Sequence, residues 1–293
     1  IVSNFSLLND EKLNFLVTNN FGICTSLDGP KKVHDFNRRL SSGSSYDRVV
    51  KWIGVIKNEL KYPLNALPTV TRHSLSFPRE IVDEYVRLGF DVVRARGLNN
   101  AGVASGAWRQ IGYSPEKFLE FWKSVSDYCF ELNCKGKAKI REGIVSLIAE
   151  KITSEKSLAY ACFGAPCGAA LMQAAYDHEG NVYACDEARS FEEFKIGNFK
   201  KQSYSDVFAS QTALNLVDLS SGLKGMCDAC AWHPYCGPCM VCSYGSQGSV
   251  IPKLAVDHEC KVRKGMVTYV FEKLVEGGAD AEIMRRWITP KKE

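Results

Sequence analysis

Nine of the twelve cysteines in this 293-residue chain lie between positions 162 and 260, and this clustering constrains the fold more than any other feature. In a short secreted chain such a density would indicate disulfides. Here the cysteines follow a long segment able to build its own core, since 45% of the residues are hydrophobic. The residues after Ile1 show no charged stretch leading into an apolar run, the pattern of a secretory signal. Metal or cluster ligation is therefore the better interpretation.

Charge and hydropathy exclude several classes of protein. The 37 basic and 33 acidic residues give a net charge of only +4, which does not indicate a nucleic-acid or membrane-surface binder. The uncharged segment Ser157–Tyr176 is long enough to cross a membrane, but it contains Pro166 and several glycines. We expect a cytoplasmic protein without a membrane or nucleic-acid partner.

Residues 1–155 alternate between strand and helix patterns, which predicts an α/β fold. The expected strands are Ile1–Asn4, Gly22–Leu27, Thr69–Ser74 and Phe90–Ala95. The expected helices begin after the caps Asn9 and Ser45 and at Pro78 and Pro115. Strands separated by helices form a parallel sheet with right-handed crossovers. About four strands are too few for a closed barrel, so we expect the chain to be part of a longer one.

After residue 155 the pattern changes, and we expect a second domain over residues 156–293. Leu171–Tyr176 and Asn181–Ala184 alternate around a short polar turn and predict a hairpin. Loops rich in Cys and Gly follow, and a helix from about Glu259 to Leu274 closes the domain.

The cysteine spacing suggests two sites with four thiolates each. The nine cysteines are Cys162, Cys167, Cys185, Cys227, Cys230, Cys236, Cys239, Cys242 and Cys260. Pairs separated by two residues can reach one metal centre from a tight loop. Zinc ribbons put about 15–20 residues between such pairs, whereas only five separate Cys230 from Cys236. The spacing favours iron–sulfur clusters and leaves zinc and disulfides as alternatives.

This cysteine pattern resembles the SPASM domain of radical S-adenosylmethionine (SAM) peptide maturases, from Cys167-x12-Gly180-x4-Cys185 through the four-cysteine run to Cys260. The first half agrees, because TSLDGP at 25–30 followed by HDFNR at 34–38 resembles the radical SAM partial barrel of the anaerobic sulfatase-maturase branch. The stretches around Cys185 and Cys236 are most similar to maturases of His-Xaa-Ser peptide systems. The resemblance implies the C-terminal part of a partial (β/α)6 barrel over residues 1–155, followed by a SPASM domain.

The resemblance also implies the ligands of two auxiliary [4Fe–4S] clusters. The inner cluster would use Cys162, Cys167, Cys185 and Cys239, and the outer cluster Cys227, Cys230, Cys236 and Cys260. The family usually places three residues between the last two cysteines of the run, whereas Cys236 and Cys239 are separated by two, so Cys242 is an alternative to Cys239. We expect the remaining cysteines, Cys24, Cys129 and Cys134, to be small buried residues.

The CxxxCxxC loop that holds the radical-generating cluster does not occur in these 293 residues. We expect it upstream in a parent enzyme, with this part alone inactive. The resemblance implies that the parent cleaves SAM, abstracts a hydrogen atom from a peptide or protein, and receives electrons from a flavodoxin or ferredoxin. Ser26, Arg38 and Arg96 are the candidate SAM contacts, as partners for its carboxylate or ribose.

Asp186 is the candidate catalytic base, because it directly follows the predicted ligand Cys185. In the sulfatase-maturase branch an Asp in this position is the proposed base, and we expect burial near the substrate to suit that role. Its alternative role is a hydrogen-bond acceptor in a tight turn or a partner of Arg189. Two other functions stay open for the chain: a zinc-stabilised peptide-binding module, and an iron–sulfur electron-transfer subunit without SAM chemistry.

Overall fold

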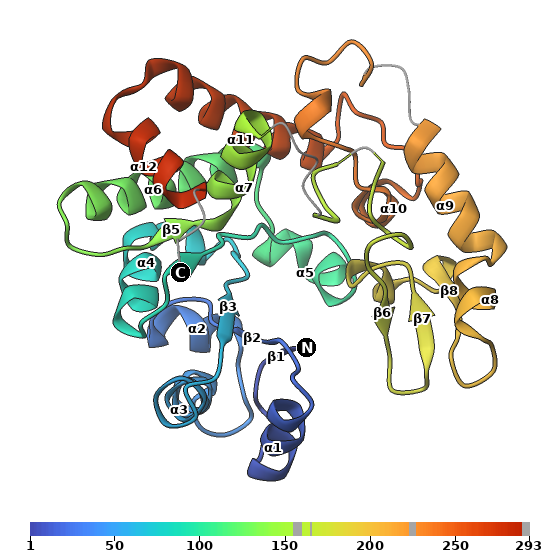
Figure 1. Cartoon of the computed structure of the whole chain (residues 1–293), viewed down its shortest axis with the longest axis horizontal. Helices are drawn as coiled ribbons and strands as arrows, with labels where there is room; N and C mark the ends of the chain where they lie inside the picture. Colours follow the sequence, from blue (N-terminus) through green and yellow to red (C-terminus); the bar gives the residue numbers. More distant parts are fainter. Residues whose placement is uncertain (155–159, 165, 223–226, 289–293) are drawn as a thin grey trace. The chain divides into compact units, whose positions relative to one another are not determined.

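The computed structural model describes residues 1–154, 160–164, 166–222 and 227–288 (Figure 1). The chain forms two compact units. The first comprises Ile1–Leu98, Lys117–Ala149 and Lys273–Glu293, and the second Asn99–Glu116 and Glu150–Glu272. The two units are interleaved in sequence, whereas the sequence predicted two consecutive domains. The predicted boundary between residues 155 and 156 lies outside the described residues.

The first unit contains two small parallel sheets. One has the strand order β1-β2-β3 and the other pairs β4 with β5; their strands are β1 (Val2–Ser3), β2 (Ile23–Ser26), β3 (Leu64–Leu67), β4 (Val92–Val93) and β5 (Arg141–Glu142). An isolated parallel bridge joins Thr69 to Arg96, just beyond β3 and β4. Parallel strands separated by helices confirm the predicted α/β pattern.

Helices lie between these strands and after β5: α1 (Asp10–Thr18), α2 (Lys31–Asn37), α3 (Ser45–Gly54), α4 (Pro78–Arg87), α6 (Pro115–Cys134), α7 (Gly143–Thr153) and α12 (Gly278–Ile288). The last turn of α7, from Glu150, belongs to the second unit. The side chain of Asn9 accepts from the N–H of Lys12 and caps α1, as predicted. Apolar positions on α1, β2 and α3 form a core with Phe5, Leu13, Ile23 and Trp52. The long α6 buries Trp122 completely.

Several local predictions for this unit were wrong. The third strand is Leu64–Leu67 rather than Thr69–Ser74, because Pro68 has no N–H for a ladder and Ser74 begins a 3-10 turn instead. The cap of α3 is Ser44, whose hydroxyl accepts from the N–H of Asp47 at 3.1 Å, and not Ser45. Cys129 is buried as expected and Cys24 is half-buried, whereas Cys134 is exposed.

The second unit is built on an antiparallel sheet. The predicted hairpin pairs β6 (Ala175–Tyr176) with β7 (Asn181–Tyr183), and β8 (Lys195–Asn198) adds a third strand that the sequence did not indicate. Its helices are α5 (Val103–Ile111), α8 (Tyr204–Phe208), α9 (Gln211–Gly222), α10 (Met240–Gln247) and α11 (His258–Glu276). Helix α11 confirms the predicted closing helix. Among the described helices, none combines the length and apolar content needed to cross a membrane.

Candidate functional site

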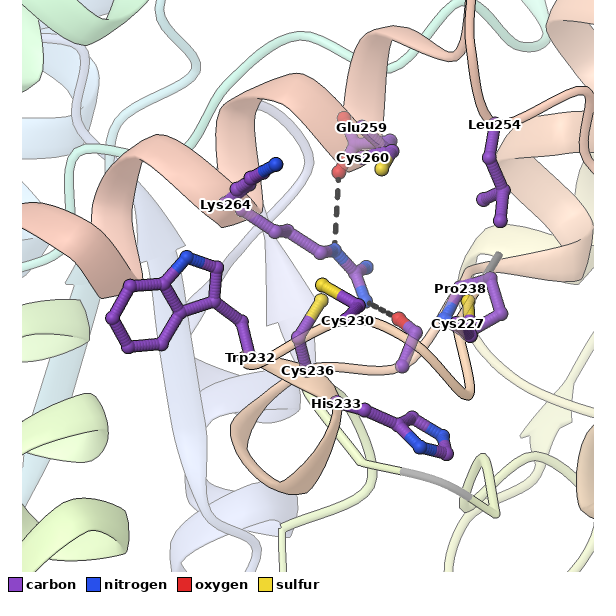
Figure 2. Close-up of a pocket in the computed structure, with 12 residues that line it drawn as sticks. Cys227, Cys230, Trp232, His233, Cys236, Pro238, Leu254, Glu259, Cys260 and Lys264 are labelled. Atoms are coloured by element: carbon purple, nitrogen blue, oxygen red, sulfur yellow. Dashed lines mark hydrogen bonds and ion pairs between the residues drawn. The ribbon is translucent and has the colours of Figure 1, made fainter. Parts of the chain in front are cut away.

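A pocket in the second unit is lined by all four cysteines predicted for the outer cluster (Figure 2). Cys227, Cys230 and Cys236 come from one loop, and Cys260 comes from the first turn of α11. The lining also includes Trp232, His233, Pro238 and Leu254. The four predicted ligands therefore share one cavity. The fold brings Cys260 to it from α11, outside the cysteine-rich loop.

Local hydrogen bonds fix this loop and the start of the helix. The N–H of Cys230 donates to the carbonyl of Cys227 at 3.0 Å, and the N–H of His233 donates to the carbonyl of Cys230 at 3.0 Å. These turns hold Cys227, Cys230 and His233 in one tight segment of the loop. At the helix, the buried carboxylate of Asp257 accepts from the N–H of Cys260 at 2.7 Å and orients its first turn.

Three of the four cysteines predicted for the inner cluster also come together. Cys185 is part of the buried core of the second unit, and Cys167 and Cys239 pack against the same core. Burial is the main cause that raises the pKa of Cys185 to about 12, and the charges of the neighbouring Cys239 and Cys167 thiols contribute to the rise. Cys162 lies near Lys151. Burial lowers the pKa of Lys151, and the thiols of Cys236 and Cys162 oppose this shift only in part.

Cys239 and Cys242 are not equivalent candidates. Cys239 is the N-cap of α10, and the N–H of Cys242 points at its sulfur over 3.4 Å. A hydrogen bond from the Cys242 side chain, with help from Arg263, lowers the pKa of Cys239 and favours its thiolate. Cys242 donates that hydrogen bond, and this donation together with burial raises the pKa of Cys242. A thiolate at a helix N-terminus is the form that ligates a metal, so the geometry favours Cys239.

Within the described part of the chain, no three His, Cys, Asp or Glu side chains converge to hold a single metal ion. No disulfide joins any two cysteines in this part of the chain. Four thiols that line one cavity match the donor chemistry of an iron–sulfur cluster. The residues present therefore fit an iron–sulfur cluster.

A second pocket lies in the first unit and is lined by cationic side chains. Its lining includes His34, Arg38, Arg39, Ser45 and Arg48. The Arg38 guanidinium forms two hydrogen bonds to buried Asp28, from Nε at 2.8 Å and from Nη2 at 3.1 Å. Ser26, at the end of β2, and Arg96, beyond β4, are half-buried and are not among the lining residues. Of the three predicted SAM contacts, Arg38 is the one that lines this pocket.

His34 also lines this pocket, which the sequence did not predict. Its Nδ1 accepts from the N–H of Asp28 at 3.2 Å, so its Nε2 carries the hydrogen. This buried Nε2 finds no hydrogen-bond partner in the described part of the chain. A buried donor without a partner is costly, and a carboxylate in the pocket would satisfy it. The HDFNR segment was the only available signal.

Asp186 lies at the start of a 3-10 turn, Glu187–Ser190, one residue after Cys185. Its position beside the predicted ligand is as expected. Its side chain is exposed, however, so the expectation of burial was wrong. The backbone enters the turn directly after the buried strand β7, and this directs residue 186 away from the core. Arg189 donates to the Asp186 carbonyl at 3.5 Å, which partly agrees with the alternative turn role.

Comparison with known proteins agrees with this geometry. Residues 167–243 match SPASM, an iron-sulfur cluster-binding domain. The chain is 21% identical over 277 residues to a cysteine-type anaerobic sulfatase-maturating enzyme of Clostridium perfringens, covering 93% of this chain and 72% of that enzyme. It is 26% identical over 246 residues to a serine-type enzyme of Bacteroides thetaiotaomicron, covering 78% of this chain and 57% of the relative.

Solved structures show the same fold. Native anSMEcpe with bound AdoMet superposes with a TM-score of 0.75 at 20% identity, over 94% of this chain and 73% of that one. The same enzyme with AdoMet and a peptide gives a TM-score of 0.76 at 20% identity, over 96% and 75% of the two chains. SuiB of Streptococcus suis gives 0.57 at 17% identity, over 86% and 58%. The chain therefore carries a SPASM iron–sulfur cluster-binding domain and has the fold of the anaerobic sulfatase-maturating enzymes, radical SAM enzymes that it resembles over nearly its whole length.

Proposed function

We propose that this chain is the auxiliary-cluster-bearing part of a radical SAM enzyme that modifies a peptide or protein. The observation that carries the proposal is the pocket lined by Cys227, Cys230, Cys236 and Cys260, in and beside the segment that matches SPASM. A zinc-stabilised module would need thiols converging on one ion. An electron carrier would not need the cationic pocket of the first unit.

The pocket thiols would hold the outer [4Fe–4S] cluster. Cys167, Cys185 and Cys239 would hold the inner one, together with Cys162. Helix α10 supports Cys239 over Cys242, because its N-terminus and the Cys242 N–H stabilise a thiolate at position 239. Buried thiols such as Cys236, whose pKa burial raises to about 11, must release their protons on ligation. Assembly of the clusters should therefore be favoured by neutral to alkaline pH.

The cationic pocket of the first unit would receive the carboxylate of SAM. His34 Nε2–H offers a buried donor, and Arg38 is held rigidly by Asp28 at the edge of the same cavity. Arg48 and Ser45 add a further cation and a hydroxyl. Ser26 and Arg96 stay candidates for the ribose. Ser26 is the last residue of β2 and Arg96 lies beyond β4, so both are at the C-terminal ends of parallel strands, where barrel enzymes keep their reactive groups.

When bound, SAM and its own cluster would supply a 5′-deoxyadenosyl radical for hydrogen-atom abstraction, and an auxiliary cluster would take up the electron released. The protein's part is to hold the cofactors, exclude water and move a proton. Asp186 stays the candidate for the last task through its position alone, one residue after a predicted ligand of the inner cluster, from which a carboxylate would accept a proton from a docked substrate. A peptide substrate agrees with the relatives, which are named sulfatase-maturating enzymes, and with the peptide-bound structure of one of them. A flavodoxin or ferredoxin would supply electrons.

The test is anaerobic reconstitution of this chain with iron and sulfide. We expect about eight irons per chain, as two clusters of four. Cys230→Ser should remove about half of the iron, because it deletes one ligand of one cluster only. Cys134→Ser is the matched control and should keep all of the iron, since this thiol is exposed on α6. Stoichiometric zinc without iron in the reconstituted protein would contradict the proposal.

A further inference from the structure

Arg263 is a buried cation that the proposed function has not used. It lies on α11 one turn after Cys260, and only 8% of its surface is exposed. Its Nε faces the carboxylate of Glu259 at 3.4 Å, and its guanidinium lies 4.7 Å from the centre of the Phe163 ring. A buried charge is retained only where partners compensate its loss of hydration. The partners of Arg263 therefore show where its charge acts.

One partner is the loop between the two predicted cluster sites. Arg263 Nη1 donates to the carbonyl of Gly237, and both interactions of its guanidinium are drawn as dashed lines in Figure 2. Gly237 and Pro238 are the only residues between Cys236, a predicted outer ligand, and Cys239, a predicted inner ligand. Arg263 thus ties the helix that carries Cys260 to the loop that joins the two sites.

The charge of Arg263 also reaches thiols of both sets. It opposes the effect of burial on the pKa of Cys236 in the outer set and of Cys167 in the inner set, and it lowers the pKa of Cys239. Lys151 lies close by and donates to the carbonyl of Phe163, whose ring packs on the guanidinium. Arg263 and Lys151 are therefore the cations beside thiols of the two sets, and Glu259 is the acidic group that opposes Arg263.

We infer that Arg263 is a positioning residue that couples the two auxiliary clusters and sets the reduction potential of both. This inference rests on the proposed function, because it requires clusters at both cysteine sets. A cluster held by four thiolates carries net negative charge, and reduction adds one more electron. A buried cation between two such clusters stabilises the reduced form of each, and the low local dielectric strengthens the effect. Arg263 should therefore raise both reduction potentials.

The experiment is an anaerobic redox titration of the iron-loaded chain, followed by electron paramagnetic resonance, with iron content measured for every variant. Arg263→Gln should favour the oxidised form of both clusters by at least tenfold, which for a one-electron couple is a shift of 59 mV to more negative potential. Arg263→Lys keeps the charge and should recover most of the shift. Glu259→Gln removes the opposing charge from the same ion pair and should shift the potentials in the positive direction.

Lys261→Gln is the matched control. It removes the same unit charge from the same helix, but Lys261 is exposed, does not line the pocket, and is screened by water. A shift for Lys261→Gln equal to that of Arg263→Gln would overturn the inference, as would unchanged potentials in Arg263→Gln with full iron. If Arg263→Gln folds poorly, the sign of the Glu259→Gln shift decides. Failure of the unmodified chain to take up iron would instead refute the proposed function.

Discussion

The buried carboxylate of Asp28 holds together the ends of two neighbouring strands, and its removal should open that region measurably. Asp28 is 1% exposed, accepts two hydrogen bonds from Arg38, and accepts one from the N–H of Thr69 at 2.9 Å. Asp28→Asn keeps the shape but deletes the charge and turns one acceptor into a donor. Breaking a buried ion pair costs about 3–5 kcal/mol. Because Arg38 keeps 26% of its side chain exposed to water, we expect the lower end, about 3 kcal/mol.

Amide hydrogen exchange measures this loss locally, whatever the state of the other unit. At about 1.4 kcal/mol per factor of ten, a loss of about 3 kcal/mol accelerates exchange roughly 100-fold. The amide of Leu27, which donates to the carbonyl of Leu67 between β2 and β3, is the reporter. The matched control is Asp47→Asn, because Asp47 pairs with Lys31 while 59% of its side chain is exposed. That exposed pair should contribute less than about 1 kcal/mol, so equal acceleration in the two variants would refute the reasoning.

Three further outcomes are expected. Cys239→Ala should lose about half of the iron while Cys242→Ala keeps it, because only Cys239 is the N-cap of α10; the reverse pattern of iron content would make Cys242 the ligand. Chelation of the iron should make residues 160–260 sensitive to protease while the first unit persists, since ligation contributes to folding; digestion followed by mass spectrometry checks this, and equal resistance with and without iron would contradict it. In an enzyme containing the radical-generating cluster, Asp186→Asn should still form 5′-deoxyadenosine but little modified peptide, and an unchanged peptide yield by chromatography would exclude Asp186 from proton transfer.

Much of the first unit could be predicted from local patterns. Asn9 and Pro78 mark helix starts through simple chemistry, a side-chain acceptor and a preset backbone angle. The β5 strand could not be found, because it has only two residues, and its buried Glu142 reads as a surface residue in sequence. In the structure Glu142 accepts hydrogen bonds from the N–H groups of Ala95, Ile144 and Val145. Ala95 is 47 residues away from Glu142, and such a long-range partner leaves no trace in a local pattern.

The cysteine sets show a similar division. Spacing indicated which thiols share a loop, and resemblance to a family supplied the division into two sets, including the grouping of Cys260 with Cys227, which line one pocket. Spacing alone did not join Cys260 to that set. Nor did spacing distinguish Cys239 from Cys242, since that difference depends on where α10 begins. Arg263 looks like an ordinary helix arginine in sequence. Only its burial and its bond to Gly237 mark it as different.

The pairing of the strands has a consequence for the order in which this chain acquires structure. In the first unit, Cys24 pairs with Asn65 and Val92 pairs with Arg141, so each contact must close a long loop. In the second unit, Ala175 pairs with Tyr183 across a short hairpin. Local pairs form in microseconds, whereas distant parallel pairs form far more slowly. The hairpin that leads directly into Cys185 should therefore exist early in folding, before the parallel sheets have closed.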